Sequence, residues 1–149
     1  MLTCALLTIL SVGSVYAQIL TDTIFDRQAE TEFAFGADAS WLSIMEDMGN
    51  IFKDDSGVQK DGMVILKEQG INALRFRVWV DPEGGWHGKD DVVYLSKRAN
   101  DLGLKVMINF HYSDSWADPG KQYKPAAWED HTFEELLDDV YNHTYEILD

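Results

Sequence analysis

The sequence is short of cysteine and of basic residues, and each shortage excludes a class of protein. Cys4 is the only cysteine among 149 residues, so the chain forms no internal disulfide and must rely on its core for stability. Only 12 Lys and Arg residues stand against 26 Asp and Glu residues, which gives a net charge of -14 at pH 7. A surface of this sign repels phosphate groups, so we expect no nucleic acid and no anionic membrane as partner. A neutral or cationic ligand fits better.

Patterns that bind metal ions or phosphate are also missing. Residues 84–89 come close to a phosphate-binding loop, but the spacing is one residue short and Asp90 stands where a Ser or Thr is needed. Residues 54–57 lack the rest of a calcium loop. None of the four histidines has zinc-ligand spacing: His87, His111, His131 and His143. We therefore predict no metal ion and no cofactor. A small nucleotide-binding or signalling module is disfavoured, because no phosphate-binding glycine motif follows a strand.

The first 17 residues have the features of a signal peptide. They contain no charged side chain and end in Val15-Tyr16-Ala17, a small-x-small pattern that suits cleavage before Gln18. No Lys or Arg precedes the apolar run, which departs from the usual pattern. A membrane anchor is the alternative, but polar residues and glycine interrupt a segment that is already short for a span. We expect a secreted protein whose mature chain begins at residue 18.

Strand-like and helix-like segments alternate beyond residue 30. Short runs rich in apolar residues predict strands at 33–37, 74–80 and 105–110. Helical spacing and end signals predict helices at 61–69, from Asp90 or Asp91 to 102, and from a capping box of Thr132 and Glu135 to about 148. The order (βα)₃ indicates an α/β protein with a parallel sheet.

Side-chain alternation along the strands indicates a barrel. In the second strand Leu74, Phe76 and Val78 share one face, while Arg75 and Arg77 lie on the other. The first strand is expected to present its phenylalanines to covering helices. A flat sheet buried on both sides would leave the two arginines without partners, whereas the mouth of a barrel would not. A complete (β/α)8 TIM barrel needs about 250 residues. We therefore expect residues 18–149 to hold its first three βα units.

The loop after the third strand is the strongest candidate for a binding site. Residues 109–120 place a histidine, aromatic rings and carboxylates where a parallel strand ends, and ligand chemistry gathers at that end. A tryptophan between two acids suits a sugar, because the ring stacks on a pyranose while carboxylates accept hydrogen bonds from hydroxyls. The alternative is an ordinary loop in which Trp116 covers the core.

Four stretches of this sequence together resemble glycoside hydrolase family 53, the endo-β-1,4-galactanases. They are Gly-Ala-Asp-Ala-Ser-Trp at 36–41, Gly-Ile-Asn-Ala-Leu-Arg-Phe-Arg-Val-Trp-Val at 70–80, Phe-His-Tyr-Ser-Asp-Ser-Trp-Ala-Asp-Pro-Gly-Lys-Gln at 110–122 and Lys-Pro-Ala-Ala-Trp at 124–128. The resemblance implies a retaining endo-glycosidase on a (β/α)8 barrel that cuts the galactan side chains of pectin. It also implies two catalytic glutamates at the ends of strands four and seven, positions that this sequence does not contain, so no acid here is assigned to catalysis.

The resemblance gives several residues a supporting role. Arg75 would hold the nucleophile ionised and oriented, against the alternative of a buried structural ion pair. His111 would donate to a substrate hydroxyl or position the acid, unless it is a core histidine. Trp116 and Asp118 resemble sugar-binding residues near the point of cleavage. Asp38 closes the first strand at the barrel mouth, and a structural turn is its alternative role.

Two further residues near these candidates, Arg77 and Asp114, are expected to have structural roles. Arg77 lies on the same face as Arg75 but outside the aligned motif, and Asp114 is expected to cap its own loop. The expected partner is β-1,4-galactan, bound by a monomer. A secreted carbohydrate-binding barrel without catalysis is the competing function. An Asn-Glu pair at the end of the next strand would favour the enzyme.

Overall fold

The computed structural model describes residues 33–149, of which residues 34–149 form one compact unit. The predicted signal peptide and its cleavage point before Gln18 lie outside the described residues. Within the described part of the chain, no helix is both long and apolar enough to cross a membrane.

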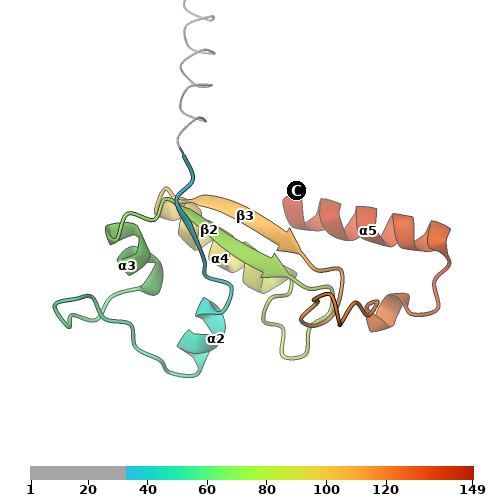
Figure 1. The fold of residues 1–149 in the computed structure, drawn as a ribbon, viewed down its shortest axis with the longest axis horizontal. Helices are drawn as coiled ribbons and strands as arrows, with labels where there is room; N and C mark the ends of the chain where they lie inside the picture. Colours follow the sequence, from blue (N-terminus) through green and yellow to red (C-terminus); the bar gives the residue numbers. More distant parts are fainter. Residues whose placement is uncertain (1–32) are drawn as a thin grey trace, which may run out of the picture. The chain divides into compact units, whose positions relative to one another are not determined.

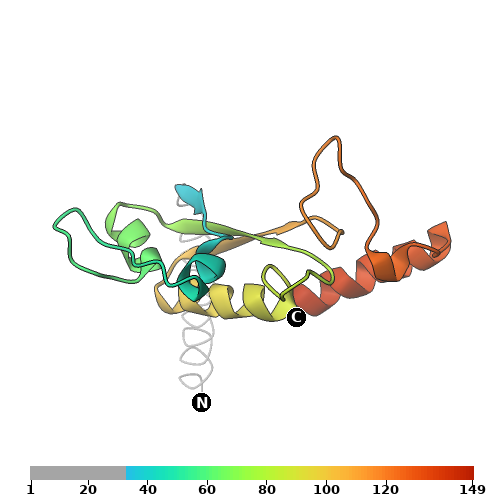
Figure 2. The ribbon, with the colours of Figure 1, turned by 90° about the horizontal axis from the view of Figure 1, so that it is seen from below.

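Three parallel strands form the sheet, in the spatial order β1-β2-β3 (Figure 1). They are β1 (Gly36–Asp38), β2 (Ala73–Val78) and β3 (Lys105–Phe110). The helical elements are α2 (Leu42–Asp47), α3 (Gly62–Glu68), α4 (Lys89–Asp101), the 3₁₀ helix η1 (Ala126–Trp128) and α5 (Phe133–Leu148). Figure 2 shows α4 running along one face of the sheet. Parallel strands joined through helices are the arrangement of a partial (β/α) barrel, as the sequence predicted.

The core lies between β2 and the helices that cover it. Leu74, Phe76 and Val78 are fully buried, as the alternation along this strand predicted. Met63 of α3 and three residues of α4 complete this layer: Val92, Leu95 and Ala99. The other face of the sheet carries the polar side chains. The prediction fails at the first strand, where Phe35 is 58% exposed. Because β1 begins only at Gly36, Ala37 packs against the core instead.

Helix boundaries follow their capping groups. The Asp61 carboxylate accepts from the N–H groups of Met63 and Val64 and begins α3. At α5 the predicted capping box of Thr132 and Glu135 is present, with both hydrogen bonds formed.

Other boundaries differ from those expected. The N-cap of α4 is Gly88, not Asp90 or Asp91, because the Asp91 carboxylate accepts from the His87 N–H at 2.7 Å within the first turn. The second strand ends at Val78 rather than at residue 80, since the next two N–H groups donate to loop carbonyls at His87 and Ser113. The sequence did not predict α2 or η1.

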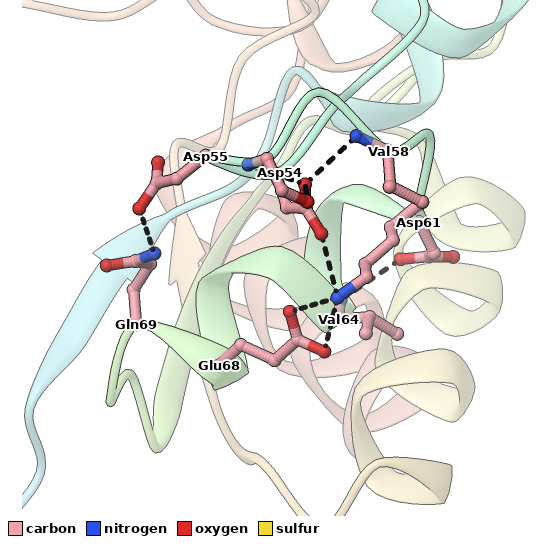
Figure 3. A network of polar contacts seen from close by, with 9 residues as sticks. Asp54, Asp55, Val58, Asp61, Val64, Glu68 and Gln69 are labelled. Carbon is pink, nitrogen blue, oxygen red and sulfur yellow. Dashed lines mark hydrogen bonds and ion pairs between the residues drawn. The ribbon is translucent and has the colours of Figure 1, made fainter.

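Ion pairs tie α2, α3 and α4 together. Figure 3 shows the loop around Asp54 folded against α3. The Lys60 ammonium lies 3.0 Å from Asp54 and 2.7 Å from Glu68. The Arg98 guanidinium of α4 contacts Glu46 of α2 at 2.7 Å and Asp61 at 2.6 Å. We call these contacts the α2–α4 ion-pair network. Each of its two cations has two carboxylate partners, so its charges are well compensated.

Candidate carbohydrate-binding site

Polar side chains meet where the three parallel strands end. The register places Asp38 of β1 beside Arg75 of β2, and Arg77 beside Asn109 of β3. His111 follows β3 directly. Because parallel strands bring their carboxyl ends to one edge, residues as far apart in sequence as Asp38 and Arg75, which are 37 positions apart, become neighbours.

Asp38 is held ionised by donors from β2 and from the loop that follows β1. Its Oδ2 accepts from Arg75 Nε at 2.8 Å and lies 2.7 Å from Arg75 Nη2, while Oδ1 accepts from the Ser40 N–H at 2.9 Å. Partial burial alone would raise the pKa of Asp38, but the hydrogen bonds from Ser40 and Arg75 outweigh it and lower the pKa to about 2. The carboxylate that Arg75 needs is therefore supplied by β1 within this chain. The role of Arg75 toward a catalytic nucleophile stays a prediction.

Arg77 is the most unusual side chain of the site. It is only 4% exposed, and its guanidinium carbon lies 5.0 Å from the Trp41 ring centre and 4.6 Å from that of Trp116. Its Nη2 is 3.6 Å from Asp38, and Nε and Nη1 have no hydrogen-bond partner among the described residues. Burial lowers the pKa of Arg77, and the attraction of Asp38 opposes this only in part. A single long ion pair offsets only part of the cost of such deep burial, and the structural role expected of Arg77 from sequence stays a prediction.

Trp41 and Trp116 enclose Arg77 from two different loops. Each ring has the guanidinium beside it, and each side chain stays 47% exposed. The predicted alternative, in which Trp116 covers the core, does not describe this position. A half-exposed indole beside a cation is well suited to stack on the apolar face of a pyranose.

His111 receives two donors on one ring nitrogen. Its Nδ1 lies 3.0 Å from the indole Nε1 of Trp79 and 3.4 Å from the backbone nitrogen of Ala117. Nε2 is 3.1 Å from the side-chain amide of Asn109. Burial lowers the pKa of His111, and the positive charges of Arg77 and Arg75 lower it further. The ring is therefore neutral at pH 7.

His87 joins the cluster through strained backbone. It has a positive φ of 65°, and its ring lies edge-on to Trp41 at 4.9 Å and to Trp79 at 4.5 Å. Burial lowers the pKa of this ring as well. Left-handed non-glycine residues are costly and gather at functional sites, where the surroundings over-determine the backbone. Tyr112, next to His111, is the other such residue in the described chain, with a φ of 44°.

Asp114 and Asp118, in the loop after β3, make contacts that differ from those predicted. Asp118 turns toward its own loop, where Oδ1 accepts from the Gly120 N–H at 2.7 Å, and it lines an open pocket of ≈ 440 Å³ with His111 and Tyr123. Asp114 does not simply cap its own loop. It accepts from the N–H groups of Asp81 and Ala126 and so ties the loop after β2 to η1.

The structure brings four of the five predicted site residues into one cluster, while Asp118, in the same loop as Trp116, turns toward Gly120. Arg75 contacts Asp38, while Trp116 contacts His111 and Arg77. Sequence reasoning gave no site role to Trp41, Trp79 or His87. The shared face of Arg75 and Arg77 was the one available signal for Arg77. Among residues 33–149 no three His, Cys, Asp or Glu side chains gather in a way that could hold a metal ion.

Known proteins match this chain over the whole compact unit. The model of glycosyl hydrolase family 53 matches residues 34–149. A probable arabinogalactan endo-beta-1,4-galactanase A of Aspergillus terreus is 41% identical over 76% of this chain and 33% of its own length. An endo-beta-1,4-galactanase of Bacillus subtilis is 34% identical over 89% of this chain and 33% of its own length.

Solved structures agree with the sequence relatives. The GH53 catalytic domain of Ignisphaera aggregans superimposes with a TM-score of 0.73 at 41% identity, covering 78% of this chain and 34% of that domain. The chain thus spans about a third of the length of the curated relatives it matches. On the match to residues 34–149 and these identities, the chain belongs to glycosyl hydrolase family 53.

Proposed function

We propose that this chain is part of an endo-acting glycosidase that cleaves the β-1,4-galactosidic bonds of galactan or arabinogalactan. The family match across residues 34–149 carries the proposal, because relatives that bear galactanase names share it. The local chemistry supports it: two half-exposed indoles beside a buried cation suit a neutral, ring-shaped substrate better than a phosphate or a peptide.

In this proposal the described residues bind and orient the substrate. Trp116 stacks on a sugar ring, and Arg75 and Asp38 form a fixed polar floor at the strand ends. Asp118 and the pocket that it lines beside His111 contact sugar hydroxyls. The glycosidic bond itself is cleaved by two glutamates outside this sequence, by a retaining mechanism in which one carboxyl protonates the leaving oxygen and the other attacks the anomeric carbon. The protein acts as a secreted monomer.

A panel of polysaccharides tests the activity. The intact protein is assayed for reducing-sugar release on β-1,4-galactan, cellulose, xylan and mannan, and the anomeric form of the first product is followed by NMR. We expect galactan to be preferred and the product to retain its configuration. Preference for another polymer would overturn the substrate, and an inverted product would overturn the mechanism.

The competing function is carbohydrate binding without catalysis. It predicts that the intact protein binds galactan but releases no reducing sugar. Trp116→Ala separates binding from chemistry, because loss of a stacking surface should weaken binding by about 1–2 kcal/mol with a smaller effect on kcat. Trp86→Ala is the matched control, since the Trp86 indole donates to Asp47 of α2.

A further inference from the structure

His111 is enclosed by groups that fix where its proton lies. The Trp79 indole N–H points at Nδ1 from 3.0 Å, and the backbone N–H of Ala117 approaches the same nitrogen at 3.4 Å. Both groups can only donate, so Nδ1 must be the acceptor. The proton of a neutral imidazole then lies on Nε2.

The contact on the other ring nitrogen follows from this. The Asn109 amide nitrogen lies 3.1 Å from His111 Nε2. If this NH2 group donated there, both nitrogens of a neutral ring would have to accept, which leaves no place for the proton. Half a turn about the terminal torsion of Asn109 exchanges its NH2 and its oxygen, and the oxygen then accepts from Nε2–H.

We infer that Trp79 is a positioning residue that holds His111 as the Nε2–H tautomer, and that His111 in turn orients the Asn109 amide with its NH2 group free to donate to a ligand. The hydrogen-bonded chain runs from the Trp79 indole N–H to His111 Nδ1, and from Nε2–H to Asn109 Oδ1. In this arrangement His111 has no spare N–H for a sugar hydroxyl. Asn109, which pairs in register with Arg77 on the sheet, becomes the donor instead. Its role toward galactan rests on the proposed function, whereas the tautomer does not.

The surrounding charges support a neutral ring. Arg77 and Arg75 oppose a positive charge on His111, and Asp38, the nearby acid, is already paired with both. The edge contact from Trp116 at 5.6 Å and the ring of Trp79 complete the enclosure. Donors on Nδ1 stabilise the neutral form specifically, because protonation there would remove the acceptor.

Nitrogen NMR of the intact protein tests the inference without any substrate. With ¹⁵N-labelled histidine, and the His111 signals assigned by their loss in His111→Gln, we expect a bare Nδ1 and a protonated Nε2 at pH 7. Trp79→Phe keeps an aromatic ring but removes the donor. It should shift the protonation equilibrium of His111 about two- to tenfold toward the imidazolium, so that the midpoint of its titration moves to higher pH. Trp86→Phe, which loses an indole N–H that donates to Asp47, should leave it unchanged.

Two results would overturn the positioning role. A proton on Nδ1 of the wild-type protein is one, and it needs no variant to fold. An unchanged His111 titration in a folded Trp79→Phe protein is the other. The Asn109 step has its own test: Asn109→Asp keeps the acceptor and should keep the Nε2–H signal, while Asn109→Leu should expose Nε2 to exchange with water. Equal exchange in both variants would exclude that contact, whatever substrate the protein proves to use.

Discussion

Arg77 and Arg98 are both withdrawn from solvent, yet their partners differ. Arg98 contacts Glu46 through two N–H···O bonds of 2.7 and 2.8 Å and Asp61 through a third of 2.6 Å. Hydrogen bonds to Glu46 raise the pKa of Arg98, and Asp61 raises it further. Arg77 has one ion pair at 3.6 Å and two N–H groups without a described partner, and its pKa is lowered.

Within the proposed function the two cations have different roles: Arg98 serves the fold and Arg77 serves a ligand. A paired guanidinium between helices stabilises their packing, because each lost hydration contact is replaced. A buried guanidinium with unused donors is costly to the fold, and unsatisfied buried groups need an explanation. Its place between two half-exposed indoles at the strand ends supplies one. Within the proposed function, Arg77 serves the substrate that binds there.

The largest effect is expected from Arg75, the exposed partner of Asp38. Arg75→Ala should lower kcat on galactan by about 10² or more, because a group that orients the nucleophile acts mainly in the transition state. KM should change less. Steady-state kinetics of the intact protein measure both, with Lys89→Ala as a control, since Lys89 forms only an exposed pair with Glu146 at 3.6 Å. A normal kcat in Arg75→Ala would leave this residue a structural role only.

Arg98→Met should destabilise the fold. It leaves Glu46 and Asp61 without their cation, so the free energy of unfolding should fall by about 2 kcal/mol. The loss is smaller than for a fully buried pair, because the Asp61 side chain is 39% exposed and screened by water. Denaturant titration measures the loss. A loss no larger than that of Lys89→Met would show that the α2–α4 ion-pair network adds little.

The stabilisation by Asp38 should depend on pH. Its pKa is about 2 in the folded protein against an ordinary 3.8, so the carboxylate stabilises the fold above pH 3.8 and this contribution is lost as the pH falls through 2. The full contribution is about 2 kcal/mol. The difference in unfolding free energy between wild type and Asp38→Asn should therefore shrink between pH 4 and pH 2. A difference that stays constant over this range would mean that the hydrogen bonds from Ser40 and Arg75 do not hold the pKa of Asp38 low.

Arg77→Met should change stability least. Two cation–π contacts of about 0.5–1 kcal/mol each are lost, but two unsatisfied donors are removed from the interior, and these cost about 1–3 kcal/mol each. The terms oppose one another, so the free energy of unfolding should stay within about 1 kcal/mol of wild type or rise. Thermal and denaturant melts check this. A loss as large as that of Arg98→Met would place Arg77 among the residues that hold the fold.

Elements with strong local signals were predictable from sequence. The third strand was predicted with its observed bounds, Lys105–Phe110, and the capping box fixed the start of α5. Alternation along β2 predicted both its buried face and its polar face. These features depend on neighbours in sequence and on strand geometry alone.

Other features depend on contacts that no local pattern encodes. The short helix α2 lacks a side-chain N-cap and acidic residues in its first turn, so no signal marked its start. Trp41 and Trp116 are 75 residues apart in sequence, and both rings contact Arg77. The tautomer of His111 follows from an indole 32 residues away. Where the strands end was predictable; which side chains enclose Arg77 there was not.

The most direct test of the difference between Arg77 and Arg98 is the ratio of kcat to KM on β-1,4-galactan. It is measured for Arg77→Met and Arg98→Met of the intact protein and corrected for the folded fraction. We expect Arg77→Met to lose at least about tenfold while its unfolding free energy is preserved, because only the ligand uses its free N–H groups. Arg98→Met should lose stability and keep the wild-type ratio. A wild-type ratio in Arg77→Met would contradict the claim that this buried charge is kept for the substrate.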